Sequence, residues 1–429
     1  MLNNFYKVKL KNILSVKRGT SLAGQYYATS GDKIRLTLGN FNYPNGGFKS
    51  NTSKDNIYFS APVKSEYILK KGDIITPLTE QVAGLLGETA KIPEDDLYIQ
   101  SGDIALIIPK EDKLYKDFAY YLISSKMIKY QLGAAAQQTK IRHTSPEKIE
   151  NCEAWIPKNI ETQRNISHLL DTLNDKIELN NKINKELEQM ANTLYEYWFV
   201  QFDFPDEKGR PYKSANGKMV YNDILKREIP EGWEVKNLAN NRLTTILKPG
   251  IDKFENEKIY LPTAAITDDK ITDRSNIISY ENRESRANMQ PISNSVWVAK
   301  MKKTKKILYF GNYSQKRMNE IILSTGMLGL KCKENSLEYI WNFINDNYFE
   351  EIKDRLAHGA TQESINNEDL MYIPILVPDD TILQKFATKV KELYQKKYYN
   401  EIENEELIQL RDFLLPLLMN GQVSVSSEH

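Results

Sequence analysis

The chain has 429 residues, of which 41% are hydrophobic and 27% charged, and its formal net charge is +1. This length predicts two to four domains, and the near-zero net charge argues against a uniformly basic coat for nucleic acid. The first residues lack the apolar core of a signal peptide, and no apolar run reaches the roughly 18 residues of a membrane span, so we expect a cytoplasmic protein with no membrane partner.

The first part of the chain predicts a mixed, β-rich globular domain over residues 1–158. Short apolar runs such as "GDIITPL" (72–78) and "GDIALIIP" (102–109) are bounded by Gly, Pro and Asp, which is typical of strands. The aromatic-rich stretch "LYKDFAYYLISSKMIKYQL" (114–132) predicts helix near the end of this domain.

A long helix is predicted over residues 159–204, because apolar residues recur at alternating intervals of four and three. This spacing is that of a coiled-coil seam. Asn180 and Asn184 occupy two positions in the middle of the seam, where leucine would be expected. The seam consists of Ile166, Leu170, Leu173, Ile177, Asn180, Asn184, Leu187, Ala191, Leu194 and Trp198.

Residues 205–230 predict a connector rich in Gly, Pro and charge, in which Asn216-Gly217 indicates a tight hairpin turn. A second mixed domain follows over residues 231–378, with apolar runs such as "KIYLPTAAI" (258–266) and "SVWVAK" (295–300). A second long helix is predicted within residues 379–429, and Gly421 is placed to cap its end.

The second helix repeats the first, which indicates an internal duplication. Asn400 and Asn404 follow Asn180 and Asn184 at an offset of 220 residues and lie at the same seam positions. The segment "GAAAQQTKI" (133–141) precedes the first helix, as "GATQESI" (359–365) precedes the second. The second seam consists of Phe386, Val390, Leu393, Lys397, Asn400, Asn404, Leu407, Arg411, Leu414 and Leu418.

A helix of about 38 residues is ~57 Å long and cannot bury its apolar stripe against one compact domain. We therefore predict that the two helices pair in antiparallel fashion, and that the four asparagines fix their register at some loss of stability. The alternative is that each helix packs in its own bundle with its asparagines facing water. Lys397 and Arg411, which lie on the second seam, slightly favour this alternative.

With these features the chain resembles the specificity subunits of type I restriction–modification systems. The resemblance rests on "LLDTLNDKIELNNKINKELEQMANTLYEYWFVQFDFP", "GRPYKSANGKMVYNDILKREIPEGWEV" and "LIQLRDFLLPLLMNGQV". The family usually has Glu-Gln at the start of each long helix; here Gln163 and Gln384 match, whereas Thr162 and Leu383 depart from the pattern. The resemblance implies an α+β fold: two mixed α/β target-recognition domains separated by a pair of long antiparallel coiled-coil helices, related by a pseudo-twofold internal repeat.

The resemblance also implies a function. Each target-recognition domain reads one half of a split site in double-stranded DNA, and the helices set the gap between the halves. The helices also dock two methyltransferase (modification) subunits, and two motor-nuclease (restriction) subunits join for cleavage. The specificity subunit itself performs no catalysis and needs no cofactor.

The sequence agrees with a chain that has no catalytic residues of its own. It contains no Asn-Pro-Pro-aromatic motif of a DNA methyltransferase and no phosphate-binding GxxxxGK[ST] motif of a motor. Its four histidines show no metal-ligand spacing, so we expect no metal site. Cys152 and Cys332 lie far apart and outside any CxxC motif, which predicts reduced thiols.

Contacts to DNA require lysine and arginine at phosphates and hydrogen-bonding side chains at bases. Four clusters fit, although charge runs most often form a solvated surface: "SVKRGTS", "QQTKIRH", "KMKKTKK" and "NYSQKRMNE", with "ATQES" as the repeat of the second. The candidate residues are Lys17, Arg18, Thr20, Gln137, Gln138, Lys140, Arg142, Lys300, Lys302, Lys303, Lys305, Lys306, Gln315, Lys316, Arg317, Thr361 and Gln362. The competing hypothesis is a coiled-coil adaptor that joins proteins and binds no DNA.

Overall fold

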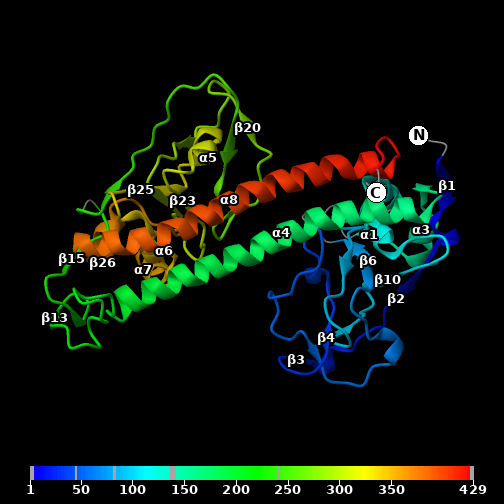
Figure 1. Ribbon diagram of the computed structural model, residues 1–429, viewed down its shortest axis with the longest axis horizontal. Coiled ribbons are helices and arrows are strands. Elements are labelled where there is room, and N and C mark those ends of the chain that lie inside the picture. Colours follow the sequence, from blue (N-terminus) through cyan, green and yellow to red (C-terminus); the bar gives the residue numbers. More distant parts are fainter. Residues whose placement is uncertain (1–3, 44–45, 81–83, 136–141, 240, 426–429) are drawn as a thin grey trace. The chain divides into compact units, whose positions relative to one another are not determined.

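The computed structural model describes residues 4–43, 46–80, 84–135, 142–239 and 241–425 (Figure 1). The chain forms two compact units, the first made of Met1–Glu178 with Asn404–His429 and the second of Leu179–Glu403. The unit boundary cuts both long helices, α4 (Ile160–Tyr195) and α8 (Asp380–Met419), so that each unit contains part of each helix. Strands and helices occur in both units, which confirms the α+β class.

The first unit is built on a four-stranded antiparallel sheet. The strands of the whole unit are β1 (Phe5–Lys9), β2 (Leu14–Arg18), β3 (Tyr27–Ala28), β4 (Ile34–Arg35), β5 (Tyr58–Phe59), β6 (Ile74–Pro77), β7 (Thr79–Glu80), β8 (Ala90–Lys91), β9 (Tyr98–Ile99), β10 (Ile104–Pro109), β11 (Arg142–His143) and β12 (Glu153–Pro157). The central sheet has the order β2-β10-β6-β8, and a second sheet has the order β3-β5-β4-β9. Two pairs, β1 with β12 and β11 with β7, complete the unit.

The α-helices α1 (Lys116–Ser124), α2 (Lys126–Ala135) and α3 (Pro146–Glu150) precede α4 in the described part of the first unit. The sequence predicts helix throughout 114–132, but the chain turns at Ser125, where the backbone is extended. Phe118 and Leu122 of α1 are fully buried, in the same core as Leu170 of α4 and Leu418 of α8. The core of the first unit therefore includes the segments of both long helices that belong to this unit.

The second unit repeats this plan. Its strands are β13 (Met219–Asn222), β14 (Arg227–Pro230), β15 (Glu234–Asn237), β16 (Thr244–Ile246), β17 (Lys258–Leu261), β18 (Ile266–Thr267), β19 (Lys270–Ile271), β20 (Ile277–Ile278), β21 (Ala287–Met289), β22 (Ser295–Ala299), β23 (Ile307–Phe310), β24 (Ile321–Ser324), β25 (Met327–Cys332) and β26 (Pro374–Val377). The order β16-β25-β22-β23 matches that of β2-β10-β6-β8, and β15 pairs with β26 as β1 pairs with β12.

The second unit also contains a sheet of order β20-β17-β24-β21 and the hairpins β18–β19 and β13–β14. Its helices are α5 (Gln315–Glu320), α6 (Leu337–Asn345) and α7 (Asn347–Leu356), and a π-helical turn (Glu196–Val200) extends α4. The pair α6–α7 follows β25 as α1–α2 follows β10, at an offset of 221 residues. The strands predicted from the apolar runs quoted above correspond to β6, β10, β17 and β22, which confirms them.

The predicted position of the connector hairpin is wrong. The hairpin is β13–β14, and its turn lies between Asn222 and Arg227. Asn216 has a left-handed backbone (φ 65°), but it ends an earlier turn, in which the Gly217 amide donates to the Tyr212 carbonyl at 2.7 Å. The Asn216-Gly217 pair thus indicates the left-handed backbone correctly, but its turn lies before the hairpin β13–β14 and does not connect the two strands.

The predicted cap of the second helix is confirmed. Gly421 has φ 68°, its amide donates to the Leu418 carbonyl at 3.2 Å, and the Gln422 amide donates to the Leu417 carbonyl at 2.9 Å. These two bonds form a Schellman motif, which satisfies the last carbonyls of α8.

Candidate nucleic-acid interface and helix seam

In the second unit the segments of α4 and α8 contact each other through asparagines. Asn400 Nδ2 donates to Asn184 Oδ1 at 2.8 Å, and Asn180 Nδ2 donates to Glu403 Oε2 at 2.7 Å. Residue numbers rise along α4 as they fall along α8, so these two segments run antiparallel within the unit. All three asparagines are buried, as is Asn404 in the first unit. None of the four seam asparagines therefore faces water.

Lys397 of α8 is also buried in the second unit, where it is 8% exposed. Its ammonium forms ion pairs with Glu188 of α4 and with Asp269 in the turn between β18 and β19, and it lies 3.7 Å from Glu401. Burial alone would lower the pKa of Lys397, but the three carboxylates raise it well above its ordinary value. Lys397 thus stays charged and links the globular part of the unit to both helices.

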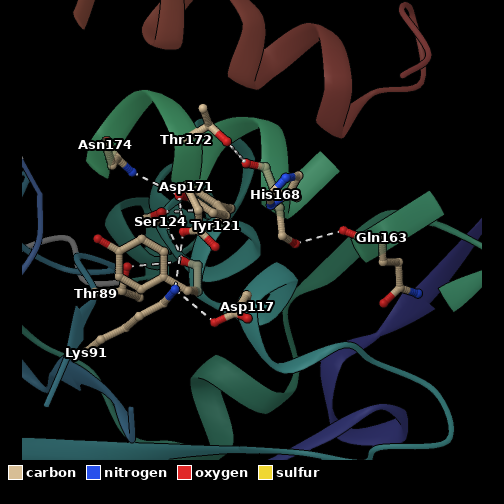
Figure 2. Close-up of polar contacts among 12 residues, drawn as sticks. Thr89, Lys91, Asp117, Tyr121, Ser124, Gln163, His168, Asp171, Thr172 and Asn174 are labelled. Carbon is tan, nitrogen blue, oxygen red and sulfur yellow. Dashed lines mark hydrogen bonds and ion pairs between the residues drawn. The ribbon is translucent and has the colours of Figure 1, made fainter. Parts of the chain in front are cut away.

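A polar cluster in the first unit also links the globular part to α4 (Figure 2). Lys91 of β8 lies 2.8 Å from Asp117 of α1 and 3.2 Å from Asp171 of α4. The Tyr121 hydroxyl donates to Asp171 Oδ1 at 2.7 Å, and Asn174 Nδ2 donates to the Tyr121 hydroxyl at 2.9 Å. Burial raises the pKa of Tyr121 well above its ordinary value, so the hydroxyl keeps its proton.

The strongest candidate surface for DNA in the second unit combines two segments that the sequence analysis predicted separately. The Lys302 amide donates to the Glu363 carbonyl at 3.0 Å, and the Ile365 amide donates to the Lys300 carbonyl at 2.9 Å. A bridge between Met301 and Ser364 lies between these bonds. The lysine-rich segment 300–306 and the segment 361–364 therefore form one surface.

Three lysines of this surface already have partners within the protein. Lys302 forms a 2.9 Å ion pair with Glu363, which is exposed. The ammonium of Lys305 donates to the Asn345 carbonyl at 2.7 Å, and that of Lys306 donates to the Thr263 carbonyl at 2.7 Å. These lysines stabilise the loop between β22 and β23.

Lys300 of this surface and the neighbouring Arg286 lie close enough for their charges to interact. Among the described residues no carboxylate lies within ion-pair distance of either side chain. Both surround Gly326: the Lys300 amide donates to the Gly326 carbonyl at 3.0 Å, and a Cβ at Gly326 would lie 3.1 Å from the Arg286 guanidinium. Burial, and then the charge of Arg286, lower the pKa of Lys300. Arg286 is not among the residues predicted from the sequence, because nothing near it in the chain marks it.

Five of the remaining candidates of the second unit are exposed. Gln315 and Lys316 are exposed on α5, and Gln315 Nε2 donates to Asn319 Oδ1 at 3.0 Å. Thr361 and Gln362 are exposed, as is Lys303, whose backbone has φ 53°.

Arg317 differs from its neighbours on α5. Its guanidinium lies 2.9 Å from Glu401 of α8 and 5.2 Å from the centroid of the Tyr398 ring, and its side chain is only 11% exposed. Arg317 therefore contacts the long helix within the second unit.

In the first unit, Lys17 and Arg18 are the last two residues of β2, and Thr20 follows the strand. Lys17 forms a 2.7 Å ion pair with Glu66, and Arg18 Nε donates to the Gly102 carbonyl at 2.8 Å. Arg142 lies 3.7 Å from the buried Glu80, across the pairing of β11 with β7. Gln137, Gln138 and Lys140 lie outside the described residues.

The described part of the chain shows neither a metal-binding cluster nor a membrane-spanning helix. It contains no group of three or more His, Cys, Asp or Glu side chains able to hold a metal ion. Within the same ranges, no helix is long and apolar enough to cross a bilayer.

Comparison with known proteins supports the resemblance to type I specificity subunits. The model of the type I restriction modification DNA specificity domain matches residues 3–189. The type I restriction enzyme HindI specificity subunit of Haemophilus influenzae is 24% identical, over 84% of this chain and 89% of its own. Residues 3–189 of this chain thus match the type I specificity domain, and most of the chain is similar to a type I specificity subunit.

Two further comparisons agree with this family. The MjaIX specificity subunit of Methanocaldococcus jannaschii is 26% identical, over 74% of this chain and 71% of its own. The crystal structure of a type I S subunit from M. genitalium has a TM-score of 0.55 at 15% identity, and covers 97% of this chain and 96% of that one, so it shares the fold. The comparisons thus support a role in DNA target recognition for this chain.

Proposed function

We propose that each unit of this specificity subunit reads one half of a bipartite DNA site, and that α4 and α8 form an antiparallel pair that sets the gap between the halves. The repeated strand order supports two recognition domains of one design, because both units place the same four-stranded sheet before a helical pair. The single observation that carries the proposal is the pairing of Asn184 with Asn400. A polar pair in an apolar seam favours one register of the helices over its neighbours.

The helices also dock partner subunits. In the second unit Leu179 and Met190 of α4 are exposed, and in the first unit Leu410 and Phe413 of α8 are exposed, Phe413 to 66%. Exposed large apolar side chains on a helix are characteristic of protein interfaces. Methyltransferase subunits would cover these side chains, motor-nuclease subunits would join for cleavage, and the specificity subunit would contribute no catalytic residue.

Mapping of methylated sites tests the proposal. Cells that express this subunit with its methyltransferase should methylate one asymmetric motif, in which two specific halves are separated by a fixed non-specific gap. A continuous motif would refute the reading of a split site. No methylation dependent on this chain would favour the competing hypothesis, an adaptor that uses the exposed side chains of α4 and α8 and binds no DNA.

Arg286 and Lys300 are the phosphate contacts that we propose for the second unit, since both lack an acidic partner among the described residues. Replacing both by glutamine should weaken DNA binding by the assembled methyltransferase at every sequence. It should also reduce the salt slope by about 0.9 for each phosphate that the variant no longer neutralises. The control is Lys236→Gln, because Lys236 lies on β15 and pairs with Glu234. An unchanged slope in the double variant would remove this surface from the interface.

A further inference from the structure

Each unit joins its recognition domain to its long helix through a short set of polar contacts. In the first unit the domain supplies the tyrosine and the helix supplies the asparagine of a hydrogen bond, in which Asn174 Nδ2 donates to the Tyr121 hydroxyl. Lys91 and the Tyr121 hydroxyl both approach Asp171 of α4, and Asn174 of α4 contacts the same hydroxyl (Figure 2). Tyr121 is buried, so breaking these hydrogen bonds leaves polar groups away from water.

In the second unit the helix supplies the donor. The Tyr394 hydroxyl of α8 donates to Asn342 Oδ1 of α6 at 3.0 Å, and both side chains are buried. Glu338, one turn before Asn342, is also buried, which raises its pKa, while the charge of Lys391 on α8 acts in the opposite direction. The helix here presents a hydroxyl and a cation, and the domain presents an amide oxygen and a carboxyl group.

These positions correspond between the two units. The long helices correspond at an offset of 220 residues, and α1 corresponds to α6 at an offset of 221. The matched positions are Asp171 with Lys391, Asn174 with Tyr394, Asp117 with Glu338 and Tyr121 with Asn342. At the first pair the sign of the charge on the helix is reversed, and the tyrosine and asparagine of the hydrogen bond have exchanged places between helix and domain.

We propose that these exchanged contacts make the two joins mutually exclusive, so that each recognition domain fits only its own long helix. A first domain on α8 would bring Lys91 towards Lys391 and Tyr121 against Tyr394. A second domain on α4 would bring Glu338 towards Asp171. The first combination would suffer from like charges and from two tyrosine rings in place of a tyrosine and an asparagine, and the second from like charges. Both combinations are therefore disfavoured, although the two domains have the same strand order.

Two other ion pairs between the domain and the helices of the second unit do not follow this exchange. The ion pair of Lys397 with Asp269 places its charges as Lys391 and Glu338 do, with the cation on the helix and the anion on the domain of the second unit. The ion pair of Arg317 with Glu401 places its charges the other way round, with the anion on the helix and the cation on the domain. Position 177, which matches Lys397, is an isoleucine, so the ion pairs of Lys397 are not repeated at this position of α4.

Reciprocal substitution in the first unit is the first test. Tyr121→Asn and Asn174→Tyr should each lower the melting temperature of the full-length chain by roughly 2–8 °C, since each breaks a buried contact in a unit of this size. The double variant rebuilds the pairing of the second unit and should recover at least half of the larger decrease. The control is Tyr130→Asn, which removes an exposed tyrosine of α2. Decreases that simply add in the double variant would overturn the proposal.

A second test moves the first domain (residues 5–157) into the place of residues 234–377, either with native α8 or with Lys391→Asp and Tyr394→Asn. The substituted chain should melt at a higher temperature than the unsubstituted one, and equal melting would count against the proposal. The predicted DNA site, an inverted repeat of the first half-site, rests on the proposed function. A gain in stability without methylation of that site would therefore contradict the proposed function and leave the exclusive joins intact. If neither chain folds, the reciprocal substitution decides.

Discussion

The hydrogen bond between Asn184 and Asn400 is the most informative single contact of the seam, because each amide is buried and has the other as partner. We expect Asn400→Leu to destabilise the second unit by about 1–3 kcal/mol, since it leaves the Asn184 amide without this bond. Replacing both asparagines by leucine should cost less than either single change, because no polar group is then stranded.

Urea denaturation followed by circular dichroism measures these differences in the full-length chain. The informative quantity is the coupling between the two substitutions. If the double variant is destabilised as much as the two single variants together, the asparagines act independently and the pair does not set the register.

The two buried cysteines are natural reporters, one in each unit. Burial raises the pKa of the Cys152 thiol to about 11 from 9.0, and burial also raises the pKa of Cys332. Since the thiolate is the reactive form, neither thiol should react with iodoacetamide in the native chain near pH 8, whereas both should react after unfolding. Rapid labelling of Cys152 in the native chain would contradict this expectation.

The same shift has a consequence for stability. A thiol with a raised pKa in the folded state keeps a proton that the unfolded chain has released, so its contribution is complete below pH 9 and declines as the pH rises towards 11. Replacing Cys152 by alanine should flatten this part of the pH profile of unfolding. An unchanged alkaline slope would assign the decline to other groups.

At the scale of elements, the end of α8 depends on Gly421. A Cβ at this position would lie 2.7 Å from the Phe5 ring of β1, and the backbone has φ 68°. Gly421→Ala should therefore destabilise the first unit by about 1–3 kcal/mol, through the left-handed backbone and the clash with Phe5. Differential scanning calorimetry measures the decrease.

The matched control is Gly209→Ala. Gly209 also has a positive φ, of 76°, but no atom lies within 4 Å of a Cβ there. Its destabilisation should reflect the backbone alone and be the smaller of the two. Equal destabilisation at both positions would show that Phe5 does not contribute.

The elements that were predictable from the sequence have a local period. The alternating intervals of four and three that begin at Ile166 and at Phe386 fall in α4, its π-helical extension and α8, because each turn of a helix repeats the signal. The break at Ser125 was not predicted, since apolar residues continue on both sides of it. The connector hairpin was misplaced because two neighbouring segments carry turn residues, and Asn-Gly does not reveal which of them pairs with a strand.

Contacts between distant residues had no local signal. Lys397 on the seam favoured a helix face in water, but it is buried, because Glu188 and Asp269 approach it from other parts of the chain. The surface formed by residues 300–306 and 361–364 was predictable as two basic or polar clusters, whereas their pairing and the neighbouring Arg286 required the fold.

At the scale of the whole molecule, the unit boundary suggests where the helices can be lengthened. It falls between Glu178 and Leu179 in α4 and between Glu403 and Asn404 in α8. Insertion of seven residues at both places keeps the seam in phase and leaves the described contacts within each unit unchanged. Each helix gains ~10.5 Å, which corresponds to about three base pairs of DNA.

If the helices set the gap, both half-sites should stay the same while the gap lengthens by about three base pairs. That change also rotates the two half-sites relative to each other, so methylation should be weaker than in the wild type. Insertion of 21 residues adds ~31.5 Å, close to the ~34–36 Å of one turn of DNA, and should restore methylation at a gap longer by about nine or ten base pairs. Sequencing of methylated sites measures both. Insertion into α4 alone is the control, and it should abolish methylation because the seams no longer match. Altered half-site sequences, or an unchanged gap after both insertions, would refute the proposed ruler.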